Sequence, residues 1–211
     1  MDLLIPFRLA KDCGLKRLNV VNKVMSTLAR EENCGVFLNC GRELSVASTK
    51  AFMSQVTVLT LVSLWFAQCK RYKETKKMRA GLISELRFLS GNMEKTIEQS
   101  VDFAKHVSSK VLKGHDHIYL LGSGLAEIAT KEGSLKIKEL TYTHCQALNL
   151  GSNIANSFYS YMAAHMDTPM ILTVLDTGNV ESDLKVMEVI EEKLFKGAPR
   201  NAVVITDIKD V

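Results

Sequence analysis

The sequence contains few prolines and glycines, the residues that interrupt helices and strands and that dominate many low-complexity segments. It has 3 prolines and 12 glycines among 211 residues, and no stretch is low in complexity. This composition excludes disordered, collagen-like and mucin-like proteins. Because 46% of the residues are hydrophobic, the chain can bury a substantial core, as one large domain or two small ones.

Closely spaced cysteines and a large charge of one sign are also missing. The five cysteines are scattered, and no two form a CxxC pair, which favours a reduced, cytoplasmic protein. A net charge of +4 is too small to predict a nucleic-acid partner. The basic run at residues 70–79 is broken by Glu74. We interpret it as a solvated segment between helices, with a nucleic-acid patch as the weaker alternative.

No long hydrophobic run is uninterrupted. The first twelve residues contain Asp2 and Pro6, so they do not form a secretory signal. The longest apolar stretch, residues 56–69, contains two threonines, a serine and a glutamine. We interpret it as too short and too polar to span a bilayer, so no membrane partner is expected.

What is present is an alternation of short apolar runs with stretches of helical periodicity. The predicted strands are residues 15–22, 34–40, 117–121, 169–175 and 201–206. The predicted helices are residues 2–13, 25–32, 48–71, 74–88, 92–112, 125–143, 152–165 and 181–195. This alternation predicts parallel strands joined by crossover helices, an α/β layered fold in which the strand at 34–40 is buried.

Two of the predicted helical regions bear on domain organisation. The helix at 48–71, which we expect Ser48 to cap, is apolar around most of its circumference and is predicted to be the most buried helix. The helical region 74–112 contains no strand and separates two α/β halves, with a predicted border near Gly91.

Ligands of parallel sheets bind at the carboxyl ends of strands and at helix N-termini. The candidate loops are therefore residues 40–48, 122–124 and 176–180. Gly122-Ser123-Gly124 lacks the third glycine of a dinucleotide fingerprint, because Glu127 stands there. We interpret the segment as a tight turn whose amides face a sugar.

Two stretches carry a specific resemblance: residues 40–59, CGRELSVASTKAFMSQVTVL, and residues 131–148, KEGSLKIKELTYTHCQAL. Together they resemble the isomerase part of the glutamine:fructose-6-phosphate amidotransferases, which consists of two sugar isomerase (SIS) domains. The resemblance implies a three-layer, flavodoxin-like parallel-sheet fold with two SIS halves, residues 1–91 and 92–211, the first lacking its N-terminal strand and phosphate loop. It also implies a hexose phosphate ligand and a homodimer, with neither metal nor organic cofactor.

The resemblance assigns roles to four residues. Val46 and Ser48 fall in the VASTK motif that lines the family's sugar-phosphate pocket, and Lys136 and Glu139 match its catalytic lysine and glutamate. Glu139 would move a proton between C1 and C2 of the sugar, and Lys136 would stabilise the anionic intermediate. The alternative is a plain surface ion pair, since Glu132 precedes Lys136 by four residues, the favourable spacing on a helix.

The departures from the family pattern lead us to expect a chain that is inactive or incomplete by itself. Ala155 stands where the family has its ring-opening histidine, and His144 is the one nearby residue that could replace it, although a core or surface role is expected. The glutaminase domain and C-terminal tail are also expected to be absent, and sugar phosphates to bind weakly. Whether the chain is an enzyme is left open. The alternatives are a non-catalytic module that binds carbohydrate derivatives and a subunit that pairs with a complete paralogue.

A metal site is not predicted. His115 and His117 could be combined with Cys145 or Cys40, but the spacing of these residues does not match a ligand pattern.

Overall fold

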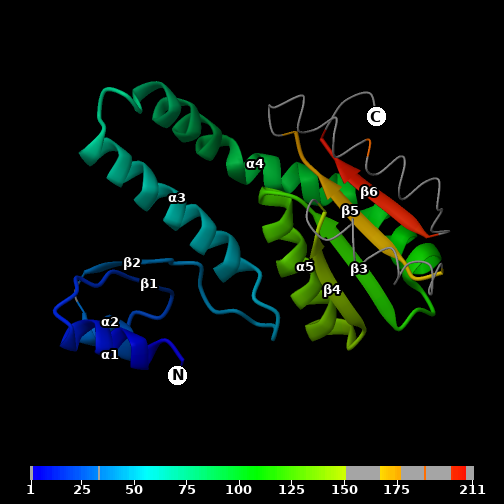
Figure 1. The fold of residues 1–211 in the computed structure, drawn as a ribbon, viewed down its shortest axis with the longest axis horizontal. Helices are drawn as coiled ribbons and strands as arrows, with labels where there is room; N and C mark the ends of the chain where they lie inside the picture. The colour runs from blue at the N-terminus through cyan, green and yellow to red at the C-terminus, as the bar shows by residue number, and fades with distance from the viewer. Residues whose placement is uncertain (1, 33, 151–166, 177–187, 189–200, 208–211) are drawn as a thin grey trace. The chain divides into compact units, whose positions relative to one another are not determined.

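The computed structural model describes residues 2–32, 34–150, 167–176, 188 and 201–207 (Figure 1). The chain divides into two compact units, Met1–Lys95 and Thr96–Val211. The predicted helices at 152–165 and 181–195, and most of the loop at 176–180, lie outside the described residues.

The first unit contains short elements followed by two long helices. In chain order they are α1 (Leu4–Asp12), β1 (Asn19–Val21), α2 (Thr27–Glu31), β2 (Gly35–Phe37), α3 (Lys50–Lys70) and the first part of α4 (Lys76–His106). Ser26 caps α2, because its hydroxyl accepts a hydrogen bond from the Ala29 amide at 3.3 Å.

The two strands of the first unit pair in parallel, but they are shorter than predicted, and β2 is exposed. The prediction of a buried strand at 34–40 is therefore wrong. Parallel strands become buried where helices cover both faces of a larger sheet, and these two strands form a sheet by themselves.

The helix α3 is the largest departure from the sequence prediction. It was expected to be the most buried helix, yet Leu64 is its one buried residue. Its exposed large side chains are Val56, Leu59, Leu61, Trp65 and Phe66. The expectation is wrong because the apolar pattern shows which sides of a helix are hydrophobic. It does not show whether other elements pack against those sides.

The same helix bears on the interpretation of the apolar stretch at 56–69. By length and composition α3 is apolar enough to cross a membrane, contrary to the interpretation from the sequence that the stretch is too short and too polar. Core helices of soluble proteins can be equally long and apolar, so length and composition alone assign α3 no location.

A single helix, α4, replaces the two helices predicted at 74–88 and 92–112, and Gly91 lies in its interior. It continues into a π-helical segment, Val107–Leu112. Lys95 and Thr96, the border between the two compact units, both lie within α4.

The turn between α3 and α4 is held by the buried side chain of Arg79. Its guanidinium donates hydrogen bonds to Thr75 Oγ1 at 3.0 Å, Gln68 Oε1 at 3.2 Å and the Tyr72 carbonyl at 2.7 Å. The guanidinium carbon also lies 5.0 Å from the centre of the Tyr72 ring. One cation therefore connects the end of α3, the turn and the start of α4.

The second unit contains a four-stranded parallel sheet, in the order β4-β3-β5-β6. The strands are β3 (His117–Gly122), β4 (His144–Asn149), β5 (Met170–Val174) and β6 (Ala202–Thr206). The predicted α/β fold with parallel strands is confirmed, and β3, β5 and β6 coincide with predicted strands. The strand β4 was not predicted.

Side chains of this sheet are buried on both faces. Tyr119 and Leu121 of β3 belong to a cluster with Leu150, Met170, Leu172 and Val174. Ile118 and Leu120, which alternate with them, belong to a second cluster with Cys145. Burial on both faces is characteristic of parallel sheets.

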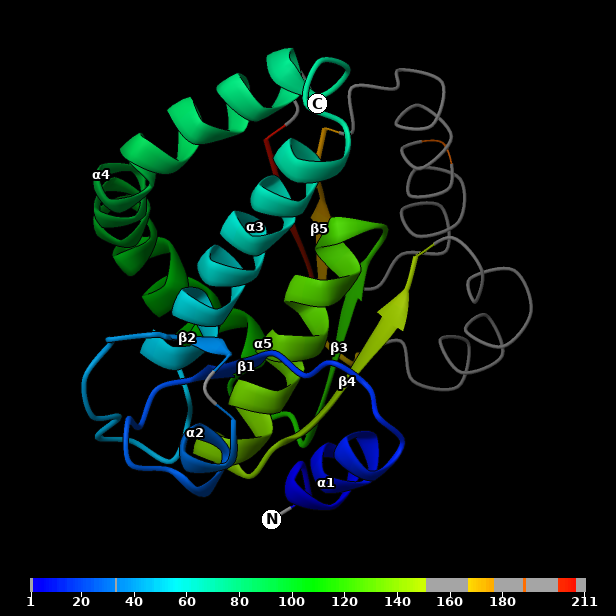
Figure 2. The same cartoon turned by 90° about the vertical axis from the view of Figure 1, so that its left-hand side faces the viewer.

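The helix α5 (Leu125–Thr141) packs along β3 and β4 (Figure 2). The Ser134 hydroxyl donates a hydrogen bond to the Cys145 carbonyl at 2.7 Å and so fixes the helix to β4. Ile137 packs against the cluster formed by Ile118, Leu120 and Cys145. This is the face of the sheet that α5 covers.

The turn between β3 and α5 is tight, as the sequence predicted. A Cβ atom on Gly122 would lie 2.7 Å from the Ala126 carbonyl carbon, and Gly124 adopts a φ of 57°. Only glycine permits this approach of helix to strand. Packing therefore explains Gly122 and the positive φ explains Gly124, without a nucleotide.

Candidate functional site

The loop from Cys40 to Thr49 joins β2 to α3 and is held from both ends. Asn22, just after β1, accepts a hydrogen bond from the Cys40 amide at 3.2 Å and donates one to the Gly41 carbonyl at 2.6 Å. Lys50 donates to the Arg42 carbonyl at 2.9 Å. The loop is thus anchored at the carboxyl end of the small sheet, where ligands of such sheets are expected.

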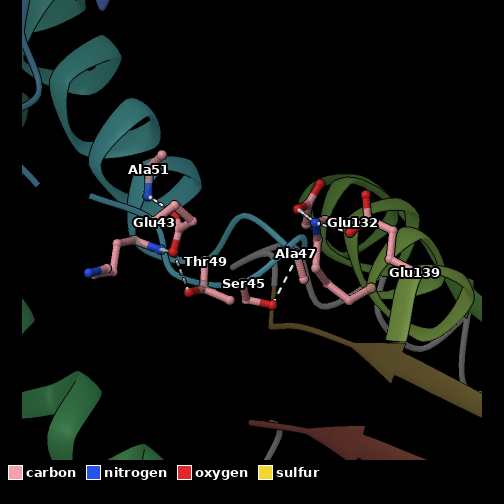
Figure 3. A network of polar contacts seen from close by, with 9 residues as sticks. Glu43, Ser45, Ala47, Thr49, Ala51, Glu132 and Glu139 are labelled. Atoms are coloured by element: carbon pink, nitrogen blue, oxygen red, sulfur yellow. Dashed lines mark hydrogen bonds and ion pairs between the residues drawn. The ribbon is translucent and has the colours of Figure 1, made fainter. Parts of the chain in front are cut away.

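The helix α3 is capped by Glu43, and not by Ser48 as predicted. The Glu43 carboxylate accepts hydrogen bonds from the Ala51 amide at 3.1 Å, the Lys50 amide at 3.4 Å and the Thr49 hydroxyl at 3.2 Å (Figure 3). The prediction missed this cap because Glu43 lies seven residues before the helix, outside the local capping pattern.

These bonds determine the charge at the helix N-terminus. The hydrogen bonds from the Ala51 amide, then the Lys50 amide and Thr49, hold the pKa of Glu43 below its usual value, although desolvation opposes the shift. The amides of Lys50 and Ala51 would otherwise attract an anion. A phosphate approaching them would have to compete with a carboxylate that is already bound.

Val46 and Ser48 lie in this loop, before α3 begins. Val46 is 86% exposed, and Ser48 is half-buried. Between them Ala47 is buried, and its amide donates to the Ser45 hydroxyl at 3.2 Å. The Ser48 hydroxyl is not used as a helix cap, which leaves its role as a sugar-phosphate ligand a prediction.

A cavity of about 490 Å³ adjoins the loop, between α3 and the first part of α4. Its lining includes Cys40 and Lys50, but most of its wall is formed by apolar side chains of the two helices, such as Met53, Val58 and Leu86. A sugar phosphate needs polar groups around its hydroxyls, so this cavity does not match the predicted ligand.

Lys136 and Glu139 are in direct contact on α5, as the three-residue spacing predicted. Lys136 Nζ lies 2.7 Å from Glu139 Oε2 and 3.3 Å from Glu132 Oε1 (Figure 3). The three side chains are about one quarter exposed or less, at 20% for Lys136, 24% for Glu132 and 26% for Glu139. The cluster therefore contains a cation between two carboxylates, partly shielded from water.

The protonation of Lys136 follows from this geometry. Its hydrogen bond to Glu139, with a smaller contribution from Glu132, raises the pKa of Lys136 above its ordinary value, while desolvation acts in the opposite direction. Lys136 therefore remains a cation at neutral pH. That is the charge state that stabilisation of an anionic intermediate requires.

Val46 and Ser48 belong to the first unit, and Lys136 and Glu139 to the second. Ala155, at the position of the family's ring-opening histidine, lies outside the described residues.

An acidic residue also lies in the first turn of α5, the helix that follows the candidate loop at 122–124. Glu127, in the first turn of α5, forms an ion pair with Lys131 at 2.7 Å and accepts a hydrogen bond from Asn149. These two contacts, Lys131 first, hold the pKa of Glu127 below its usual value. The resulting negative charge disfavours binding of a phosphate at this helix N-terminus.

His144 is the first residue of β4, and its ring faces His117, the first residue of β3. In a parallel sheet both residues therefore lie at the amino ends of their strands. Ligands of such sheets bind at the opposite, carboxyl edge. This position favours the expected structural role of His144 over that of a substitute for the ring-opening histidine.

No family model matches the sequence. Curated relatives do match most of the chain. It is 34% identical over 198 residues to a glutamine--fructose-6-phosphate aminotransferase [isomerizing] from Fusobacterium nucleatum. This alignment covers 94% of this chain and 31% of the relative. With the enzyme of the same name from Bacteroides thetaiotaomicron the identity is 30% over 215 residues, covering 99% of this chain and 34% of the relative. The chain thus spans about a third of the length of these relatives.

Solved structures agree on the fold. The C-terminal domain of glucosamine-fructose-6-phosphate aminotransferase from Francisella tularensis superposes with a TM-score of 0.76 at 24% identity, covering 97% of this chain and 59% of that chain. A Clostridium difficile protein assigned as a phosphosugar isomerase gives a TM-score of 0.72 at 20% identity, with 97% and 55% of the two chains covered.

Proposed function

Because the chain is related to the sugar isomerase (SIS) region of the glutamine--fructose-6-phosphate aminotransferases, we propose that it is a sugar-phosphate domain of the isomerase type. The ligand in this proposal is a hexose phosphate, fructose 6-phosphate or glucosamine 6-phosphate. Val46 and Ser48 contact it, and Lys136 and Glu139 carry the chemistry. The observation that supports the proposal most strongly is the contact of Lys136 with Glu139 at 2.7 Å.

The contact supplies the two groups that an isomerisation between C1 and C2 needs. A carboxylate takes a proton from one carbon and returns it to its neighbour, which Glu139 does in this proposal. The cation stabilises the oxygen anion of the enediol intermediate, which is the role of Lys136. Lys136 must shift from Glu139 toward the substrate for this, and Glu132 remains as its second carboxylate partner.

We propose that turnover is slow, because Ala155 supplies no group for ring opening. Hexose phosphates exist mainly as closed rings, and a general acid-base residue contributes about 10²–10⁴-fold to such a step. In this proposal Ala155→His raises isomerase activity within that range. Unchanged activity in this variant would remove ring opening as the explanation for slow turnover.

We propose a homodimer in the cytoplasm that needs no metal or organic cofactor for this chemistry and binds neither nucleic acid nor membrane. The residue ranges 1–91 and 92–211 are proposed as parts of two SIS halves. A non-catalytic module and a pairing subunit are the alternatives, and binding and turnover of fructose 6-phosphate distinguish them.

The first measurement is binding. Fructose 6-phosphate is titrated into the purified chain and followed by NMR, with fructose as the control that lacks the phosphate. Saturable shifts with the phosphate ester, reduced by Ser48→Ala, are expected. Absence of saturable binding would contradict both the isomerase and the sugar-phosphate module, and would leave the pairing subunit.

The second measurement is isomerisation of fructose 6-phosphate to glucose 6-phosphate in a coupled assay. Glu139→Gln should abolish the residual activity, whereas Glu132→Gln is the matched control, since it removes the other carboxylate that contacts Lys136. Equal activity in the two variants would show that the cluster is a structural ion pair. Binding without any turnover would favour the non-catalytic module.

A further inference from the structure

Two histidines that are far apart in the sequence face each other across the sheet of the second unit. His117 and His144 are register partners at the start of β3 and β4, strands that lie side by side (Figure 1). Their Nδ1 atoms are 3.2 Å apart, and their rings are inclined by 70° with centroids 5.2 Å apart. Both residues are exposed.

The pair is separate from the cluster of Lys136 and Glu139. Ile118 and Cys145, the next residues along the two strands, point to the face of the sheet that α5 covers. Because successive side chains of a strand point to opposite faces, His117 and His144 lie on the other face. Neither Glu132 nor Glu139 takes part in the contact between the two histidines.

Two ring nitrogens at this distance cannot both direct a lone pair at each other, so either a hydrogen or a metal ion must lie between them. With one proton the pair forms the hydrogen bond that the structure shows. A metal ion fits the same space, because two bonds of about 2.05 Å to nitrogens 3.2 Å apart enclose an angle of about 103°. This angle lies between the square-planar and tetrahedral values.

We propose that His117 and His144 form a binding site for a late first-row divalent transition metal ion, of the class of Ni²⁺, Cu²⁺ and Zn²⁺. Neutral imidazole is a preferred ligand of these ions, whereas Mg²⁺ and Ca²⁺ require oxygen ligands. On binding, the ring that carries its proton on Nδ1 moves it to Nε2. Both rings are exposed, so water transfers the proton and none is lost.

The coordination number defines what kind of site this is. Among the residues that the structure describes, no group of three or more histidine, cysteine, aspartate or glutamate side chains could hold a metal. Water therefore completes the coordination of the ion. The site binds a metal reversibly and leaves open positions, unlike the closed, four-ligand sites that stabilise small folds.

The strands hold the two rings in place before the metal arrives. The His144 amide donates a hydrogen bond to the Asp116 carbonyl at 3.1 Å, which fixes the start of β4 beside β3. Ile118 and Cys145, directly after the histidines, are buried in the sheet. The pairing register therefore fixes the backbone separation of the ligands.

The test is calorimetric titration of the whole chain with Ni²⁺. The exposed thiols of Cys13, Cys34 and Cys69 and the half-buried thiol of Cys40 are first blocked with iodoacetamide, since they would also bind the metal. One ion per chain is expected. Removing even an outer partner of a metal ligand costs about 10–100-fold in affinity, so His117→Ala and His144→Ala should each weaken binding at least about 10-fold. His106→Ala, on the exposed surface of α4, is the matched control and should bind Ni²⁺ like the parent.

A second measurement keeps the result independent of folding. Ni²⁺ should raise the Tm of the parent and of His106→Ala, but not that of His117→Gln, which retains a side chain of similar size. Circular dichroism verifies that the variants fold. Binding that is unaffected by His117→Ala and His144→Ala, or that is lost equally in His106→Ala, would overturn the proposal.

Discussion

The two compact units use similar hydrophobic side chains with opposite results. In Thr96–Val211 the strands β3 and β5 bury Leu121, Met170 and Leu172 almost completely. In Met1–Lys95 the helix α3 is also mostly apolar, yet leaves Leu59 and Trp65 more than half exposed. The difference shows that burial depends on the layers that a sheet provides, and not on hydrophobic composition.

Core truncation should give the largest effect and tests this comparison directly. Leu121→Ala removes a fully buried side chain from the cluster with Tyr119 and Met170, and should lower the free energy of unfolding by about 2–5 kcal/mol. Leu59→Ala on α3, 52% exposed, should change it by about 0.5 kcal/mol. Urea unfolding measures both. Equal losses would show that α3 is covered in solution.

Arg79 should matter most within the first unit. Arg79→Ala removes the donor for Gln68, Tyr72 and Thr75, and should cost about 1–3 kcal/mol of unfolding free energy, because partly buried acceptors are left unpaired. The exposed neighbour Lys77 provides the control, as Lys77→Ala should be nearly neutral. A neutral Arg79→Ala would mean that the α3–α4 turn needs no anchor.

Glycine substitutions should have opposite signs in the two units. Gly81 and Gly91 lie inside α4 with open space around the missing Cβ, so alanine at either position should stabilise by about 0.5–1 kcal/mol. Gly122→Ala should destabilise, because its Cβ would meet the backbone of Ala126 at 2.7 Å. Thermal unfolding of the three variants measures these changes in stability. A stabilising Gly122→Ala would contradict the close approach of Gly122 to Ala126.

The smallest effect should be that of Glu43, and it should depend on pH. The pKa of Glu43 is lowered in the folded chain relative to its ordinary value of 4.5. Its stabilisation is therefore present above pH 4.5 and is lost as the pH falls through the lower, folded-state pKa. Glu43→Gln should lower Tm slightly at neutral pH and match the parent in acid. Glu85→Gln, exposed on α4, is the control with little effect. A Tm difference that persists at low pH would refute capping by the Glu43 carboxylate.

The sequence predicted the parts of the fold that depend on patterns of neighbouring residues. The runs of β3, β5 and β6 are mostly apolar, and the spacing of Lys136 and Glu139 places them on one helical face. The strand β4 was missed because HCQALN alternates weakly and owes its extended form to pairing with β3. Strand propensity depends on such context.

Contacts across long sequence separations could not be predicted in the same way. The carboxylate that caps α3 is seven residues away from the amide of Lys50, and His117 and His144 are separated by 27 residues. Their meeting depends on strand register, which one sequence does not reveal. For the same reason α3 was predicted to be buried, since its pattern carries no information on the elements that surround it.

The continuity of α4 has a consequence for limited proteolysis. Proteases cleave exposed, extended backbone, whereas the border at Lys95 and Thr96 lies within helical turns. Arg71 and Lys73, in the exposed turn before α4, offer trypsin a more accessible site. Mild digestion should therefore cut the chain at this turn before it cuts at the border between the two compact units.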